Sequence, residues 1–158
     1  MSRPSAPRPL TIASEILGPI DVDTRALITF PEGMYGFPEC RRFALLTTPR
    51  EGTWWLQSAD HSALAFLLVD PFLYLPSHFH LDLAPTELAR LQTSSASDIL
   101  ILAVVTMPTA SGAPSTANLQ APILFNLAKC LAWQCIRNDG GFGVREEFDL
   151  NLLSAQPA

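Results

Sequence analysis

The sequence predicts an all-β fold, mostly antiparallel, with one short helix. The prediction rests on about ten short apolar runs, on turn residues between them, and on a single segment with helical spacing. With 158 residues, 48% of them hydrophobic, the chain has the size and apolar content of one domain. Short strands joined by turns suit an antiparallel barrel or a sandwich, and this pattern does not choose between the two.

The N-terminal half contains a hairpin and three further strands. Thr11–Leu17 and Ile20–Val22 flank the turn dipeptide Gly18-Pro19, which predicts the hairpin. The other strands are expected at Leu27–Phe30, Phe43–Thr47 and Thr53–Ser58. Between the first two of these, glycines and prolines predict an irregular loop that bears Met34, Tyr35 and Phe37.

The C-terminal half adds the remaining strands and the helix. Apolar and β-branched runs predict strands at Leu64–Asp70, which should be central, and at Phe79–Leu83, Ile99–Met107, Leu119–Asn126, Leu131–Ile136 and Phe142–Val144. Pro85–Leu91 has the Pro start and the Leu spacing of a short amphipathic helix. Asn138-Asp139-Gly140-Gly141 predicts a hairpin turn.

Composition narrows the class of partner. The formal net charge is −5 and the only adjacent basic residues are Arg41 and Arg42, which disfavours direct binding to nucleic acid. Charged residues are only 16% of the chain, so much of its surface is uncharged and a protein partner could cover it. Prolines and Gly112 interrupt the uncharged stretch Ile99–Ala128, so no membrane span is expected.

The chain ends and the cysteines suggest a simple organisation. We expect a disordered tail at residues 1–9, without the apolar region of a secretory signal, one domain at 10–150, and a C-terminal tail at 151–158. Cys40, Cys130 and Cys135 are odd in number and lack C-x-x-C spacing, which favours a reducing compartment.

No segment has the pattern of a catalytic, cofactor or metal site. His78 and His80 would share a strand face with Asp82, and a third ligand such as His61 could complete a metal site, although an exposed polar face is the simpler interpretation. Phosphate-binding loops, dinucleotide fingerprints, hydrolase elbows and zinc-protease motifs do not occur in the sequence. We therefore expect no enzyme, no cofactor and no metal; a metal- or thiol-dependent enzyme is the alternative.

The cysteines are expected to be structural. Cys130 and Cys135 stand among apolar residues, where a thiol is a small core group with a raised pKa. The neighbouring Arg41 and Arg42 would favour the thiolate form of Cys40, yet the sequence places no His or acid to complete a catalytic pair with it.

Four segments, in order, resemble the bacterial flagellar assembly factor FliW family. They are Ile28–Phe37 (ITFPEGMYGF), Trp55–Ser58 (WLQS), Leu64–Pro71 (LAFLLVDP) and Thr116–Asn126 (TANLQAPILFN). The resemblance implies a small β-barrel-like domain that acts as a monomer in the cytoplasm. It also implies binding to newly made flagellin and, after flagellin export, binding and inhibition of the translational repressor CsrA. A generic β interaction scaffold is the remaining alternative.

Six residues are candidates for protein binding: Tyr35, Phe37, Asp70, Asn118, Phe125 and Asn126. Asn118 and Asn126 bracket a strand whose Pro122 lacks an N–H, so this strand should be at an edge or bulged, with the asparagines bonded to nearby backbone. Alternatively, the irregular strand and the Tyr35–Phe37 loop offer a docking surface for a flagellin segment.

The remaining candidates also have two interpretations. Tyr35 and Phe37 are either partner anchors or core residues, and Asp70-Pro71 is either a turn that orients the chain or a charged contact. The net charge of −5 predicts that an acidic surface helps to capture a basic repressor.

Overall fold

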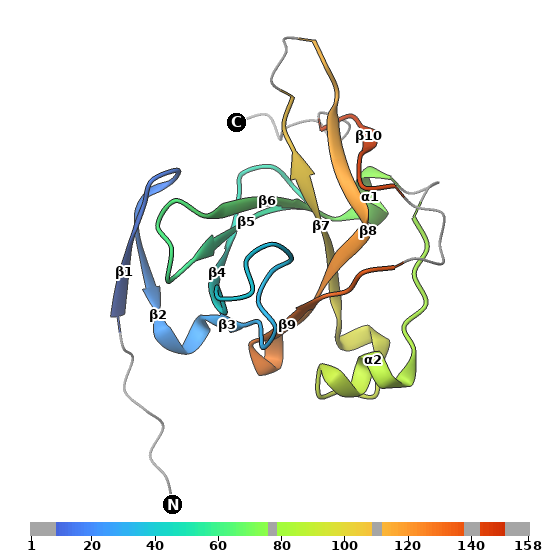
Figure 1. Ribbon diagram of the computed structural model, residues 1–158, viewed down its shortest axis with the longest axis horizontal. Helices are drawn as coiled ribbons and strands as arrows, with labels where there is room; N and C mark the ends of the chain where they lie inside the picture. The colour runs from blue at the N-terminus through green and yellow to red at the C-terminus, as the bar shows by residue number, and fades with distance from the viewer. Residues whose placement is uncertain (1–8, 76–78, 109–111, 138–142, 151–158) are drawn as a thin grey trace, which may run out of the picture.

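A computed structural model describes residues 9–75, 79–108, 112–137 and 143–150, and their strands form a closed barrel (Figure 1). The barrel order is β8-β7-β6-β5-β4-β3-β9, and β9 pairs again with β8. Its strands are β3 Ile28–Thr29, β4 Arg42–Thr47, β5 Thr53–Ser58, β6 Ala65–Val69, β7 Leu100–Thr106, β8 Ser115–Asn126 and β9 Leu131–Gln134. The all-β prediction is confirmed, and of the two architectures left open by the sequence, barrel and sandwich, the structure has the barrel.

The N-terminal hairpin lies against one side of the barrel. It pairs β1 (Pro9–Ser14) with β2 (Gly18–Asp23), and Ile12 packs with Leu27 and Ala44 of the barrel. The predicted turn is displaced, because Ser14 pairs with Gly18 and residues 15–17 make the turn. The Ser14 hydroxyl accepts a hydrogen bond from the Leu17 N–H at 2.9 Å, which closes this turn.

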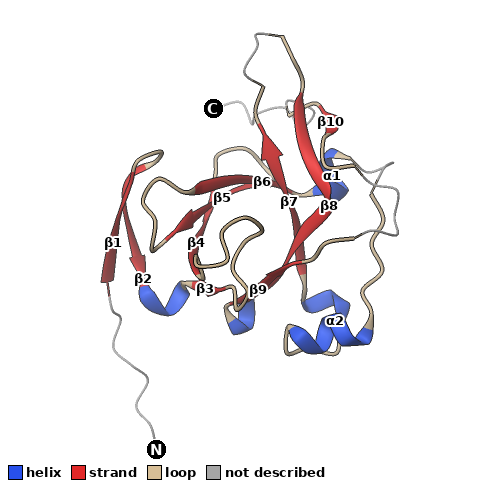
Figure 2. Ribbon diagram, viewed as in Figure 1, coloured by secondary structure: helices blue, strands red, loops and turns tan. Residues whose placement is uncertain are grey.

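Short helices lie outside the barrel (Figure 2). The expected helix is present as α2 (Pro85–Arg90), whereas α1 (Pro71–Tyr74) was not expected. Asp70 caps α1 by accepting the Phe72 N–H at 2.9 Å, which supports the interpretation of Asp70-Pro71 as a local structural signal. The described residues also contain three 3₁₀ turns: η1 Thr24–Ala26, η2 Ala96–Asp98 and η3 Leu127–Lys129. The helices that the structure describes are all too short to cross a lipid bilayer.

The prediction of a strand at Phe79–Leu83 is wrong. This segment has no regular secondary structure and joins no ladder with any described residue, and buried Phe79 packs in a cluster that contains Val69 and Tyr74. Alternation arises here from packing over the barrel and not from a sheet. The last strand also differs: β10 is Glu146–Phe148, which pairs with the start of β8. The predicted 138–141 turn and the expected tails up to residue 8 and from residue 151 lie outside the described residues.

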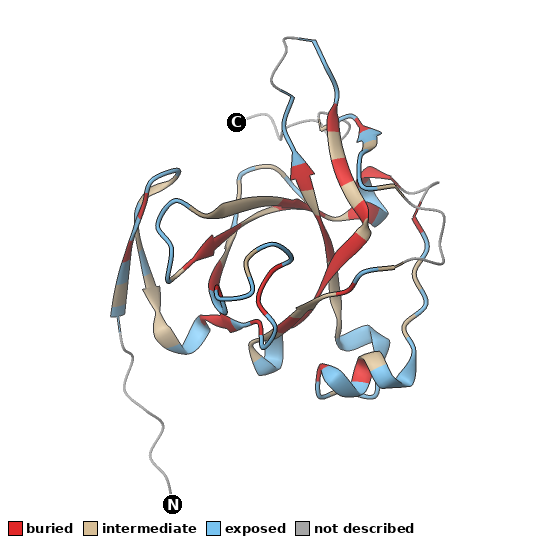
Figure 3. Ribbon diagram, in the orientation of Figure 1, coloured by how far each residue is buried: buried red, intermediate tan, exposed pale blue. Residues whose placement is uncertain are grey.

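The main core consists of buried residues from the barrel strands and from the loop between β3 and β4. Figure 3 shows the buried stretches of the barrel strands in red. Phe30, Phe43 and Phe125 are fully buried and meet edge to face, with ring centroids of Phe30 at 4.9 Å from Phe43 and 6.0 Å from Phe125. Such aromatic pairs contribute about 0.5–1.5 kcal/mol beyond the burial of their area. Phe43 comes from β4 and Phe125 from β8, while Phe30 directly follows β3, so three separate segments of the barrel contribute to this cluster.

Strand β8 contains the predicted irregularity. Leu102 of β7 faces Ile123 and Val104 faces Asn118, so one residue of β7 lies opposite four residues of β8. The Asn118 side-chain oxygen accepts the N–H groups of Gln120 and Ala121 at 3.1 Å each, which stabilises this bulge. The bulge is therefore confirmed, but β8 is not an edge strand, because β7, β9 and β10 all pair with it.

The loop between β3 and β4 lies across one end of the barrel, in front of the ring of strands in Figure 1. Met34 and Phe37 bond through both backbone groups, and Met34 inserts into the main core with only 3% of its surface exposed. Two glycines with positive φ, Gly33 at 70° and Gly36 at 89°, allow the chain to reverse twice within this loop.

Candidate functional site

The barrel closes between β3 and β9 through a single parallel residue pair, Thr29 with Leu131. The Thr29 N–H donates to the Cys130 carbonyl at 2.8 Å. The next ladder hydrogen bond would come from residue 31, and Pro31 has no N–H to donate. The two sides of the seam separate from this point.

A groove of about 500 Å³ opens where the seam separates, and we call it the seam groove. Its residues are Glu32, Gly33, Met34, Tyr35, Gly36, Pro38, Arg90, Trp133, Gln134 and Ile136. A second, smaller hollow continues from it past Pro31, Leu131 and Ala132 along the same seam. One wall is thus the loop that covers the barrel end, and the other is β9 with its continuation.

The Gln134 side chain bridges the two walls of the groove. The Tyr35 N–H donates to Gln134 Oε1 at 2.7 Å, and Gln134 Nε2 donates to the Ala121 carbonyl in β8 at 3.2 Å. The Tyr35 side chain stays 75% exposed, and Ile136 on the opposite wall is 48% exposed. Large apolar side chains therefore stand on both sides of an opening whose backbone is fixed.

Arg90 of α2 covers one rim of the groove. Its guanidinium lies over the Trp133 ring, 4.2 Å from the centroid, and its NH1 lies 3.1 Å from Glu32 Oε2. Both charged side chains are about half exposed, so the ion pair stabilises the fold by about 0–1 kcal/mol. The main effect of these contacts is to hold the Arg90 side chain in place over Trp133, and they add little to the stability of the barrel.

Helix α2 is itself held by a buried polar cluster. Glu87 accepts from the Ala84 N–H at 2.9 Å and pairs with Arg137 at 2.8 Å, with both side chains of the pair 15% exposed. The Cys135 thiol donates to the other Glu87 oxygen at 3.1 Å. Burial, with this hydrogen bond to Glu87, raises the pKa of Cys135 to about 11, in the direction expected for a cysteine among apolar residues.

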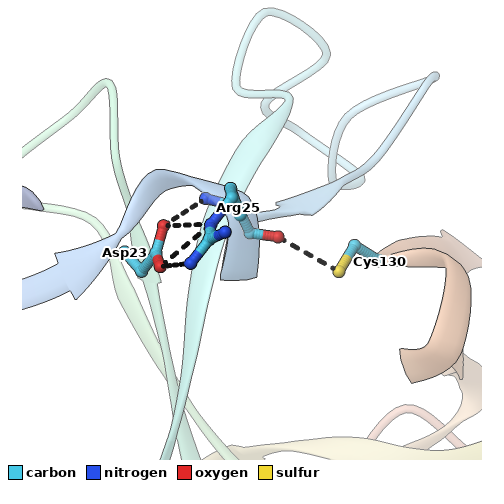
Figure 4. A network of polar contacts seen from close by, with 3 residues as sticks. All are labelled: Asp23, Arg25 and Cys130. Atoms are coloured by element: carbon cyan, nitrogen blue, oxygen red, sulfur yellow. Dashed lines mark hydrogen bonds and ion pairs between the residues drawn. The ribbon is translucent and has the colours of Figure 1, made fainter. Parts of the chain in front are cut away.

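Cys40 is buried in the main core, as expected for a structural cysteine, whereas Cys130 is less buried than expected. Burial raises the pKa of the Cys40 thiol, so its arginine neighbours do not make it a thiolate. Cys130 is only partly buried and sits in a left-handed conformation with φ 50°. Its Sγ donates to the carbonyl of Arg25 at 3.5 Å, and Asp23 holds the Arg25 side chain at 2.8 Å (Figure 4). This cysteine links η3 to the segment before β3.

The histidines do not assemble a metal site among the residues that the structure describes, where no group of three His, Cys, Asp or Glu could hold an ion. His80 pairs only with Asp82 at 3.1 Å, and these two side chains are 81% and 90% exposed. His78 lies outside the described residues.

The structure separates the six predicted binding residues. Tyr35 is on the rim of the seam groove, while Phe37 is half-buried and packs on Phe66 with ring centroids 6.1 Å apart. Asp70 caps α1, and burial raises the pKa of its carboxyl. Asn118 holds the β8 bulge.

Two of the six predicted binding residues, Phe125 and Asn126, are not accessible to a partner and correct the prediction. Phe125 is fully buried in the barrel core, so no partner can reach it on the folded barrel. Asn126 is 3% exposed, and its Nδ2 donates to the Leu91 carbonyl at 2.7 Å. Together with the Asn118 contacts, this confirms the interpretation of the asparagines as partners of nearby backbone.

The sequence did not indicate Arg90, Trp133, Gln134 or Ile136 as site residues. Trp133 is the one large aromatic residue in its predicted strand, which could have drawn attention to it. No local spacing connects these positions with Tyr35, because closure of the barrel brings them together.

Comparison with known proteins gives consistent matches. A family model described as FliW protein matches residues 11–148. The chain is 35% identical over 146 residues to the flagellar assembly factor FliW of Treponema denticola, covering 92% of this chain and 98% of that protein. It is 38% identical over 141 residues to the flagellar assembly factor FliW of Treponema pallidum, covering 89% of this chain and 91% of that protein. A crystal structure of the flagellar assembly factor FliW superposes with a TM-score of 0.79 at 31% identity, covering 87% of this chain and 95% of that one.

Proposed function

The chain belongs to the FliW family, and from this premise we propose that it is a flagellar assembly factor that binds flagellin in the cytoplasm. The observation that carries the proposal is the match of residues 11–148, which includes both walls of the seam groove. The role is one of binding and not of catalysis.

The geometry of the candidate site supports a binding role. The seam groove combines exposed apolar side chains with a backbone fixed by hydrogen bonds, which is the arrangement of a preformed protein-binding surface. Cys135, which lies between the groove residues Gln134 and Ile136 in the sequence, is buried with a raised pKa, and such a thiol is unsuited to nucleophilic chemistry.

The second part of the proposal is a partner switch. When flagellin has been exported, the free protein binds the translational repressor CsrA and keeps it from acting, so flagellin synthesis follows export. The formal charge of −5 supports capture of a basic partner, because opposite charges accelerate encounter and lower the energy of the complex.

A reconstitution with three purified proteins tests the proposal. The chain is mixed with flagellin and CsrA from the same bacterium, alone and together, and complexes are separated by size-exclusion chromatography. We expect one complex with each partner, and loss of the CsrA complex when flagellin is added in excess. A chain that binds neither partner would overturn the proposal, and a stable ternary complex would overturn the switch.

A further inference from the structure

The seam groove differs in charge from the chain as a whole. Its charged residues are Glu32 and Arg90, whose charges of −1 and +1 cancel and whose side chains pair at 3.1 Å. The formal net charge of −5 is therefore carried entirely by residues outside the groove. The seam groove is thus an apolar opening without net charge in an acidic protein.

The groove also contains large apolar side chains that are exposed to water. Tyr35 is 75% exposed on one wall and Ile136 is 48% exposed on the other, and Trp133, also in the lining, lies beneath the Arg90 guanidinium. A segment lying in the groove would contact both walls at once. Aromatic and aliphatic groups around a fixed pocket are the usual anchors of protein interfaces.

We infer that the seam groove holds an uncharged, apolar segment of flagellin; this inference rests on the proposed function and identifies its docking site. Charge selects this occupant. A charged side chain entering the groove would lose water and find no opposite charge there that is not already paired. An uncharged apolar segment buries Tyr35 and Ile136 and leaves the Arg90–Glu32 pair at the rim.

A matched pair of isoleucines provides the test. Ile136 in the groove and Ile16 in the hairpin turn are 48% and 52% exposed, so replacing either one with Ser removes a similar exposed surface. Binding of purified flagellin to the full chain is measured by calorimetry for the wild type, Ile136→Ser and Ile16→Ser. We expect Ile136→Ser to bind flagellin at least about tenfold more weakly than the wild type, and Ile16→Ser to differ from the wild type by less than about twofold. Thermal melting of all three proteins verifies that each is folded.

The salt dependence of the same titration tests the chemistry of the occupant. An uncharged segment predicts that flagellin affinity changes less than about threefold between roughly 0.05 and 0.5 M salt. Normal binding by Ile136→Ser, or a fall of more than about tenfold across this salt range, would overturn the inference while the proposed function stands. If the wild type itself does not bind flagellin, the proposed function fails and this inference fails with it.

Discussion

Two glycines of the same loop should respond very differently to alanine, although both have positive φ. At Gly33, with φ 70°, an added Cβ would lie 2.6 Å from the carbonyl oxygens of Phe37 and Pro38. At Gly36, with φ 89°, it would meet nothing within 4 Å. The neighbours of Gly33 are backbone atoms, so they cannot rotate away as a side chain would.

The expected magnitudes follow from these contacts. Both alanine variants adopt a left-handed conformation, which costs about 1–2 kcal/mol. Gly33→Ala must also displace the loop backbone, and with it the buried Met34, so its total cost should reach about 3–5 kcal/mol. In a domain of this size, 1 kcal/mol shifts Tm by about 2–4 °C. Gly36→Ala should therefore melt a few degrees lower, and Gly33→Ala lower by at least about 6 °C.

Urea unfolding followed by tryptophan fluorescence measures both free energies, and the wild type and Gly36→Ala are the controls. Equal losses for the two variants would refute the reasoning, since only the close backbone approach at Gly33 distinguishes them. A loss below about 2 kcal/mol for Gly33→Ala would mean that the loop relaxes without disturbing the barrel.

Further predictions concern the asparagines and the thiols. Asn126→Ala should lower the free energy of unfolding by about 2–3 kcal/mol, because it leaves the buried Leu91 carbonyl unpaired. Asn118→Ala, at a half-buried site, should cost about 1 kcal/mol in the same urea experiment, and the opposite ranking would contradict this account. At pH 8, iodoacetamide should alkylate Cys130 well before Cys135, as peptide mass spectrometry can measure. Because the pKa of folded Cys135 is about 11 and its ordinary value is 9.0, the thiol's contribution to stability is complete below pH 9 and is lost as pH rises to 11. Cys135→Ala should lose less stability than the wild type over that range, and parallel pH curves would argue against the shift.

Local sequence patterns predicted the strands correctly where each strand pairs with the strand that comes next along the chain. The predicted Thr53–Ser58 strand coincides with β5, and the strand expected at Leu64–Asp70 contains the central β6. The strand prediction at Phe79–Leu83 was wrong because alternating apolar residues indicate that one face of a segment is buried, and they do not show that it hydrogen-bonds to another strand. Helix α1 is a single turn, too short for any periodicity to appear.

The candidate site was less predictable, for a different reason. The Thr116–Asn126 segment identified the family, yet Phe125 and Asn126 belong to the barrel interior, where packing also restricts residue type. Tyr35 could be singled out from its glycine-rich loop, but its groove partners Arg90 and Trp133 are distant in sequence. Only barrel closure brings them together, and a single sequence does not encode that contact in any local spacing.

The single-pair seam between β3 and β9 has a consequence for the life of the protein in the cell. A partner that touches both walls of the groove binds the closed barrel and not the unfolded chain, so it raises the unfolding free energy by RT ln(1 + [L]/Kd). At a partner concentration about 100 times Kd this amounts to about 2.7 kcal/mol. If a flagellin segment fills the seam groove as proposed, the protein without this partner unfolds most readily and is then cleaved by proteases, so its lifetime follows the supply of that segment.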